Sequence, residues 1–165
     1  MQSNDMIEER DDVARYELAN RLFFRLYQCA NMLHKTGTKA VEGEGLTTQR
    51  WAVLGALSRA DAADGMAVGD LARYLKVSRQ SLSGVIGRLE HDGLVEGVAD
   101  VADRRSRLLQ LTPQGQDRWH TRALPRINDF YDAAVDGLSI EDISHALHYL
   151  VRLLDNMTAI DEQTA

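Results

Sequence analysis

Residues 78–107 read SRQSLSGVIGRLEHDGLVEGVADVADRRSR, and this stretch decides the fold. Its first half carries apolar residues at the spacing of a helix with one buried face: Leu82, Val85, Ile86 and Leu89. Ser78 is suited to cap that helix, and Gly93 is suited to end it, because glycine readily adopts the left-handed conformation found there. Two apolar segments, 94–98 and 108–111, flank a charged tip and predict a β-hairpin.

Three helices are predicted before this stretch. The first covers residues 13–39, where apolar residues recur every three or four positions, and Gly37 and the glycines at 43 and 45 are expected to break it. Thr47 or Thr48 is expected to cap a second helix with the sequence TTQRWAVLGALSRA. After a loop, AADGMA, a short third helix has an apolar face made of Val68, Leu71, Ala72 and Leu75.

Two long helices are predicted after the hairpin. Thr112 and Pro113 begin the first, Pro125 is expected to kink or divide it, and Gly137 ends it. Ser139 and Asp142 have the spacing of a capping box for the last helix. Apolar residues repeat on that helix with the spacing of a coiled-coil seam, namely Ile143, Leu147, Leu150, Leu154 and Met157.

This order of elements predicts a mainly α fold with a small β-hairpin wing. A winged helix-turn-helix core (46–112) is flanked by N- and C-terminal dimerisation helices (13–45 and 113–160) in a single domain, 13–160. Residues 1–12 are polar and acidic, and a flexible segment is expected there. The outer helices carry more apolar surface than the core can cover, which favours a two-fold homodimer.

Composition narrows the class of protein. The 165 residues carry a net charge of −6, but residues 68–107 hold seven basic and six acidic side chains, so this part is basic relative to the rest. No apolar run is long enough to cross a membrane, and the N-terminus lacks the apolar core of a signal peptide. A single cysteine fits a reducing compartment, and a cytoplasmic location is expected.

The outward face of the predicted 78–91 helix favours contact with DNA. It carries Gln80, Gly84, Gly87 and His91, and each glycine costs about 1 kcal/mol in a helix interior while allowing close approach of another surface. Ser78, Arg79 and Ser81 join Gln80 at the N-terminal end, from which recognition helices usually reach base edges. The alternative is a solvated face that is merely small and polar.

The hairpin tip strengthens this interpretation. Arg104, Arg105 and Arg107 lie within four residues, and arginines on a wing can enter a minor groove or hold phosphates. The alternative is an exposed charged hairpin without a partner.

The sequence resembles the MarR-type transcriptional regulators. The resemblance rests on LTTQRWAVL at 46–54, LARYLKVSRQSLSGVIGRLEHDGLV at 71–95 and DVADRRSRLLQLTPQG at 100–115. It implies a homodimeric winged-helix protein that binds a pseudo-palindromic double-stranded operator and usually represses transcription. It also implies DNA contacts from Ser78–Ser81 and Arg88 on the recognition helix and from Arg104 and Arg105 on the wing, with Asp103 bracing the tip. One departure is Gly97, where the family often has a basic residue.

The same resemblance implies a small-molecule effector. The family often binds small aromatic acids or related thioesters between the dimerisation helices and the DNA-binding lobe. The aromatic and polar residues near that junction are Phe24, Tyr27, Asn31, His34 and Trp51. Alternatively, Trp51 is a core residue and His34 is a solvated side chain.

Redox and zinc sensing are the alternatives. Some relatives sense peroxide through a cysteine in the first helix, at the position where this chain has Phe23. Cys29 lies on the apolar stripe, which favours a buried structural thiol. His145 and His148 are three residues apart and could share a metal, but a lone pair of this kind is usually two surface histidines. No metal site and no cofactor is therefore predicted.

An enzyme is not expected, since no catalytic triad, phosphate loop or carboxylate pair stands out. A winged helix used for protein contacts is the remaining rival, although its wing would more often be apolar. The sequence therefore predicts a DNA-binding repressor that a small aromatic acid or thioester releases from its operator.

Overall fold

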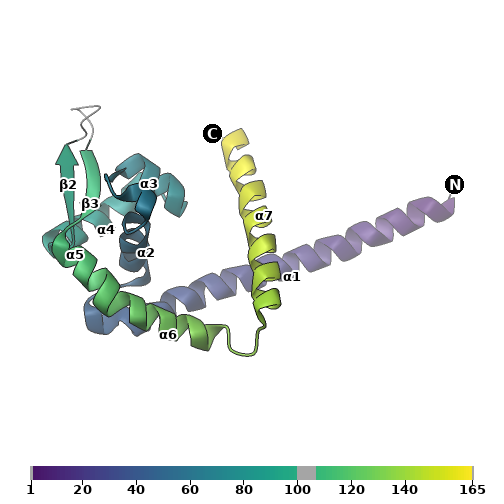
Figure 1. Cartoon of the computed structure of the whole chain (residues 1–165). Coiled ribbons are helices and arrows are strands. Elements are labelled where there is room, and N and C mark those ends of the chain that lie inside the picture. The colour runs from purple at the N-terminus through teal and green to yellow at the C-terminus, as the bar shows by residue number, and fades with distance from the viewer. Residues whose placement is uncertain (1, 100–106, 165) are drawn as a thin grey trace. The chain divides into compact units, whose positions relative to one another are not determined.

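The computed structural model describes the backbone of residues 2–99 and 107–164, and the side chains of residues 11–99 and 107–164. The elements in chain order are α1 (Gln2–Val41), η1 (Glu42–Glu44), α2 (Thr48–Leu57), η2 (Ala60–Ala62), β1 (Met66–Ala67), α3 (Val68–Leu75), α4 (Arg79–His91), β2 (Val95–Ala99), β3 (Arg107–Leu111), α5 (Pro113–Asp117), η3 (Arg118–Ala123), α6 (Leu124–Ala134) and α7 (Ile140–Thr164) (Figure 1). This mainly helical chain with a small antiparallel sheet confirms the predicted fold class. It divides into two compact units, 1–127 and 128–165.

The first helix is longer than the sequence predicted. It begins at Gln2 instead of residue 13, since no glycine or proline interrupts its first turns, and it runs through Gly37 to Val41. The prediction that Gly37 breaks the helix was therefore wrong. Gly37 is where α1 contacts α2: a Cβ there would lie 2.7 Å from Thr48 Cγ2. The flexibility expected for residues 1–12 stays a prediction.

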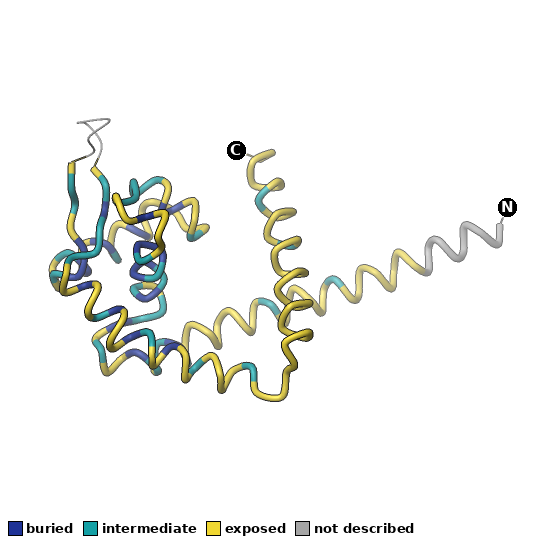
Figure 2. Tube along the Cα trace, viewed as in Figure 1, coloured by how far each residue is buried: buried dark blue, intermediate teal, exposed yellow. Residues whose placement is uncertain are grey.

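Helices α2, α3 and α4 form the core of the first unit. Figure 2 shows buried residues of this unit in these helices and in the sheet, and also at the end of α1 and along η3 and the start of α6. The largest side chains that are almost fully buried are aliphatic: Leu54, Leu71, Leu82, Leu89, Leu109, Ile127, Val41, Val53 and Val95. Burial of an aliphatic side chain of this size contributes about 1.5 to 3 kcal/mol relative to exposure. The predicted apolar face of α4 is thus its core face, with Val85 only half-buried.

The hairpin belongs to a three-stranded sheet in the order β1-β3-β2, and both pairs of neighbouring strands are antiparallel. The sequence predicted β2 and β3 but not β1, because a two-residue strand has no visible periodicity. Met66 pairs with Leu109, and Gly65 before it lies so close to β3 that a Cβ would be 2.9 Å from Leu108 Cβ. The central strand β3 therefore ties the wing to the start of α3.

The helix after the hairpin begins at the predicted residues and then changes from α-helical to π-helical hydrogen bonding. Thr112 accepts a hydrogen bond from the Gly115 amide, and Pro113 occupies the first turn. The π-helical segment η3 ends just before Leu124 and Pro125. Proline has no amide hydrogen, so it interrupts the regular hydrogen bonding of a helix at this point. The winding therefore changes next to Pro125, while residues 113–134 stay helical without a break, and the kink or division expected at Pro125 stays a prediction.

The second unit contains α7, whose predicted capping box is confirmed. Asp142 N donates to Ser139 Oγ at 3.1 Å, and Ser139 N donates to Asp142 Oδ2 at 2.9 Å. The predicted seam of α7 lies in solvent in the single chain, with Leu147 60% exposed. Among the described residues, no helix combines the length and apolar character needed to cross a membrane.

Candidate nucleic-acid interface

Helix α4 is joined to α3 by a tight turn that positions its N-terminus. Lys76 ends α3 in the left-handed conformation, with φ of 54°, and Ser78 then caps α4. The Ser78 hydroxyl accepts a hydrogen bond from the Ser81 amide at 3.1 Å and donates one to Ser81 Oγ at 2.9 Å. Two of the predicted DNA-reading serines therefore also fix the start of the helix.

The outward face of α4 is open. Gln80, Gly84, Gly87 and Arg88 are exposed, and a Cβ placed on either glycine would meet no atom within 4 Å. Packing against the described residues therefore does not require these glycines, each of which weakens a helix by about 1 kcal/mol. Glycine on an exposed helix face allows another surface to approach closely.

The Arg79 side chain packs against α3. Its guanidinium lies against Gly69 of α3, where an added Cβ would come within 2.7 Å of Nη2. The contact places a positive charge at the first turn of α3, beside the N-terminus of α4. Sequence spacing alone gives no sign of this contact, because it joins two helices.

The strands β2 and β3 lead toward the wing tip. Ala99 pairs with Arg107 at the end of the ladder, and Arg107 Nη2 donates to Glu90 Oε1 of α4 at 2.8 Å. The predicted DNA-binding residues Arg104 and Arg105, and the bracing residue Asp103, lie outside the described residues. No sequence pattern indicates this contact between Glu90 and Arg107, because it joins a helix to a strand 17 residues away.

An ion pair holds the opposite end of α4. Arg50 of α2 donates to Asp92 Oδ2 and to the carbonyl oxygen of Gly45, each at 2.8 Å. The Arg50 side chain is only 16% exposed, so this pair is better shielded than a typical surface ion pair. It ties the C-terminal end of α4 to the start of α2.

A second surface pair lies beyond the end of α2. Arg59 donates to Asp61 and to the Tyr74 hydroxyl, and its guanidinium carbon lies 4.8 Å from the centre of the Tyr74 ring. The hydrogen bond from Arg59 lowers the pKa of Asp61 below its usual value, and the same partners raise the pKa of Arg59. Both groups are ionised at neutral pH and connect this turn to α3.

A cavity of about 200 Å³ lies among α2, α3 and α4. Its lining is mainly apolar and consists of Thr48, Gln49, Ala52, Val53, Leu75, Val77, Ser81, Leu82 and Val85. The hydroxyl of Thr48 is hydrogen-bonded to His34 Nδ1 at 2.6 Å, which connects the cavity wall to α1. The predicted effector residue His34 therefore has a partner and lies one contact from this cavity.

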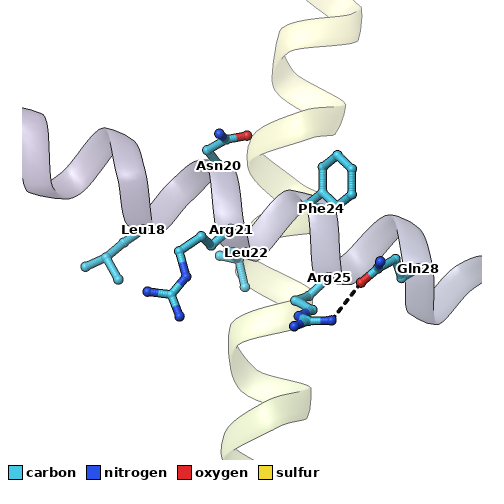
Figure 3. Close-up of a pocket in the computed structure, with 7 residues that line it drawn as sticks. All are labelled: Leu18, Asn20, Arg21, Leu22, Phe24, Arg25 and Gln28. Carbon is cyan, nitrogen blue, oxygen red and sulfur yellow. Dashed lines mark hydrogen bonds between the residues drawn. The ribbon is translucent and has the colours of Figure 1, made fainter.

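The other predicted effector residues are not gathered in one place. Trp51 is buried against Gly37, as its core alternative expected. Tyr27 and Asn31 are exposed on α1. Phe24 is 65% exposed and extends from one side of α1 with Asn20, whereas Leu18 and Arg21 extend from the other side (Figure 3). Their part in effector binding stays a prediction.

The residues considered for redox or metal sensing are also on the surface. Cys29 is exposed, so the prediction of a buried thiol was wrong for the single chain. His145 and His148 are exposed on α7. Within the described part of the chain, no three His, Cys, Asp or Glu residues are grouped closely enough to hold a metal ion.

The helix-turn-helix and hairpin have the arrangement found in a known family of regulators. The model of the MarR family matches residues 44–106. The transcriptional activatory protein BadR of Rhodopseudomonas palustris (strain ATCC BAA-98 / CGA009) is 62% identical over 152 residues, covering 92% of this chain and 87% of BadR. The chain belongs to the MarR family. As a MarR-family transcriptional regulator it is a DNA-binding protein of a non-enzymatic class.

Two further comparisons show the range of this MarR-family similarity. The homoprotocatechuate degradative operon repressor of Escherichia coli is 29% identical over 116 residues, or 68% of this chain and 76% of the repressor. The crystal structure of CouR from Rhodococcus jostii RHA1 bound to p-coumaroyl-CoA has a TM-score of 0.70 and 23% identity. The match covers 78% of this chain and 88% of CouR, and at that identity it shows the shared fold.

Proposed function

We propose that the protein is a homodimeric, effector-responsive regulator that places α4 in a major groove and the wing in the adjacent minor groove of a pseudo-palindromic operator. The observation that carries this proposal is the open face of α4. Gly84 and Gly87 leave free space beside Gln80 and Arg88, in a helix otherwise fixed by the core. DNA backbones and base edges can approach such a surface closely, whereas a protein partner would more often meet apolar side chains.

The exposed apolar faces of the outer helices support the homodimer. Leu147, Leu150 and Leu154 follow one face of α7 and are 42–60% exposed, and Leu18 and Leu22 of α1 are equally open. Large connected apolar surfaces are rare on monomers, because their burial is favourable. A second copy supplies a matching surface by symmetry.

We further propose that the effector contains an aromatic ring that enters the cavity among α2, α3 and α4. A cavity of about 150 Å³ with aliphatic walls accepts benzene, so about 200 Å³ is enough for a substituted ring. Thr48 and Ser81 offer hydroxyls at its edge. Two similar proteins, the homoprotocatechuate degradative operon repressor and CouR bound to p-coumaroyl-CoA, support an aromatic acid or its CoA thioester.

This cavity would connect the effector to DNA reading. Ser81, Leu82 and Val85 line it and belong to α4 itself. If the ligand binds the cavity more tightly in one of two positions of α4, it shifts α4 toward that position. The DNA affinity then changes by no more than the difference between the two ligand affinities allows.

The direction of regulation is proposed to be activation. The resemblance implied repression, because the family usually represses. The 62% identical relative is named an activator, while the 29% identical relative is named a repressor, and the higher identity supports activation. A reporter gene behind the DNA that flanks the chromosomal locus tests this: activation predicts lower expression when the regulator is deleted.

Binding is tested with a fluorescent duplex selected on the wild-type protein from a pool with a randomised centre. Specific binding with a steep salt dependence between about 50 and 200 mM KCl is expected. Failure to select any duplex, or affinity that does not change with salt, would contradict the proposal and favour a protein-interaction module.

Effector binding is tested by thermal shift with p-coumaroyl-CoA, p-coumarate and homoprotocatechuate, with CoA alone as the control. A ligand of the folded state raises the melting temperature. Ala52→Leu fills the cavity and should remove that increase while the duplex is still bound. An unchanged increase in Ala52→Leu would place the ligand elsewhere.

A further inference from the structure

The side chain of Arg107 joins the wing to the recognition helix. Its Nη2 donates to Glu90 Oε1 at 2.8 Å, and the two side chains are 61% and 28% exposed. Glu90 lies in the last turn of α4, one residue after the fully buried Leu89. The backbone that carries the Glu90 carboxylate is therefore held in place by the core.

The guanidinium reaches Glu90 only because residue 97 is glycine. Arg107 pairs with Ala99, and Gly97 lies two residues further along the same face of β2. A Cβ built on Gly97 would lie 1.6 Å from Nε and 2.2 Å from Cζ of Arg107. Any side chain at 97 would occupy the space that the guanidinium now fills.

The position of the pair gives it a mechanical role. Arg107 is the first residue of β3 and directly follows the segment that carries Arg104 and Arg105. The pair therefore acts at the base of the wing, at the first described residue after the tip. A bond from this point to α4 limits the angles that the wing can take relative to the recognition helix.

We propose that Arg107 is a positioning residue, held over Gly97 by Glu90, that sets the wing at the angle needed for simultaneous contact with both grooves. The inference rests on the proposed use of α4 and the wing on DNA. It also explains the departure at Gly97: the cation common at that position in the family is replaced by a cation from the neighbouring strand.

A direct contact of Arg107 with a phosphate is the rival role, and the sign of the Glu90 effect separates the two. Glu90→Ala removes a negative charge near the DNA, so electrostatics alone would strengthen binding. If Glu90 acts by holding Arg107, the same change weakens binding. The salt dependence separates them again, because loss of one phosphate contact lowers the slope of log K against log [salt] by about 0.9.

The experiment measures the affinity of the wild type, Arg107→Ala, Glu90→Ala, the double variant and Gly97→Ala for the selected duplex across the salt series. Gly97→Ala keeps both charges and displaces only the guanidinium, and its φ is not in the left-handed region. Glu96→Ala is the matched control, since Glu96 is an exposed acid on β2, next to Gly97. Thermal unfolding and sedimentation confirm that each variant is folded and retains the wild-type oligomeric state.

Each of the three single changes is expected to weaken binding about fivefold, in the range of a well-formed surface ion pair, and the double variant no more than either alanine variant of the pair. Any change in the salt slope should be the same in the three single variants, because all of them act through the same wing contacts, and Glu96→Ala should bind as tightly as wild type or more tightly. Equal or tighter binding by Glu90→Ala, or a lower slope in Arg107→Ala alone, would overturn the inference. If the wild type itself selects no duplex, the proposed function fails instead.

Discussion

Gly37 of α1 and Thr48 of α2 come so close that a Cβ on residue 37 would lie 2.7 Å from Thr48 Cγ2. The Thr48 hydroxyl is at the same time bonded to His34 and to Thr38, at 2.6 and 3.2 Å. Thr48 therefore cannot move away from α1 without losing these bonds. The junction therefore fixes α2 on the long first helix, α1.

Gly37→Ala should therefore destabilise the protein. The new methyl group overpacks the contact with Thr48 and with Trp51, whose Cζ3 would be 3.1 Å away, and a loss of about 1 to 3 kcal/mol is expected. Urea unfolding followed by circular dichroism measures it. Gly43→Ala is the control, because a Cβ there meets nothing within 4 Å. A Gly37→Ala protein as stable as wild type would contradict the close approach.

Gly84→Ala should separate stability from DNA binding. The change relieves a glycine in a helix interior and adds no contact within the chain, so unfolding should require about 1 kcal/mol more free energy. The methyl group lies on the face proposed to meet the groove, so affinity for the selected duplex should fall.

A larger change at the same position makes the test sharper. Gly84→Leu should abolish specific binding while the helix content stays at the wild-type level. Unimpaired binding by both variants would show that this face does not approach DNA.

Arg105→Ala should weaken duplex binding strongly while leaving the oligomeric state unchanged. An arginine at the wing tip can contact the minor groove and adjacent phosphates. Its removal should therefore also lower the slope of log K against log [salt] by about 0.9, the value for one phosphate contact. Fluorescence anisotropy across the salt series measures both effects. An affinity equal to wild type at every salt concentration would exclude the tip from the interface.

Leu147→Glu combined with Leu154→Glu should dissociate the proposed dimer. Both side chains belong to the exposed seam of α7, and a carboxylate there would be buried without a partner on association. Sedimentation velocity should show a monomer or an aggregate. Asn156→Glu places one carboxylate on the opposite face of the same helix and should leave the dimer intact. Dimers of wild-type stability in the double variant would remove α7 from the interface.

Ser139→Ala should raise the pKa of Asp142. The hydrogen bond from the Ser139 hydroxyl, followed by that from its backbone amide, holds this pKa below its usual value. A depressed folded-state pKa stabilises the protein above the unfolded pKa, and this contribution is lost as the pH falls through the folded value. In an NMR titration the Asp142 midpoint should move upward toward the ordinary aspartate value in Ser139→Ala. The pH dependence of unfolding at acidic pH should then be smaller than in wild type.

Elements with strong local signals could be predicted from the sequence. The cap at Ser78, the end of α4 at Gly93 and the box at Ser139 depend on residues within four positions of one another, and all are present. The outward position of Gly84 follows from helical spacing alone. These features required no knowledge of other parts of the chain.

Features that join distant residues were missed. The sequence predicts a helix break at Gly37, whereas the glycine packs against Thr48, a contact that depends on how α1 and α2 meet. The strand β1 needs only two residues, since β3 supplies its partner. The bond between Glu90 and Arg107 spans a hairpin, and no periodicity indicates it. Residues close together in the sequence specify helix caps and the buried face of a helix. Which glycines allow two elements to approach closely depends on tertiary contacts.

The hydroxyl pair at the start of α4 has a consequence for the bases that can be read there. The Ser78 hydroxyl gives its hydrogen to Ser81 Oγ and accepts the Ser81 amide, so it has no hydrogen left to offer a base. Ser81 keeps its own hydrogen. We therefore expect Ser81 alone to donate at this corner of the helix, to acceptor atoms such as guanine O6 or thymine O4, while an adenine or cytosine amine can donate to the lone pair that each of the two hydroxyls keeps.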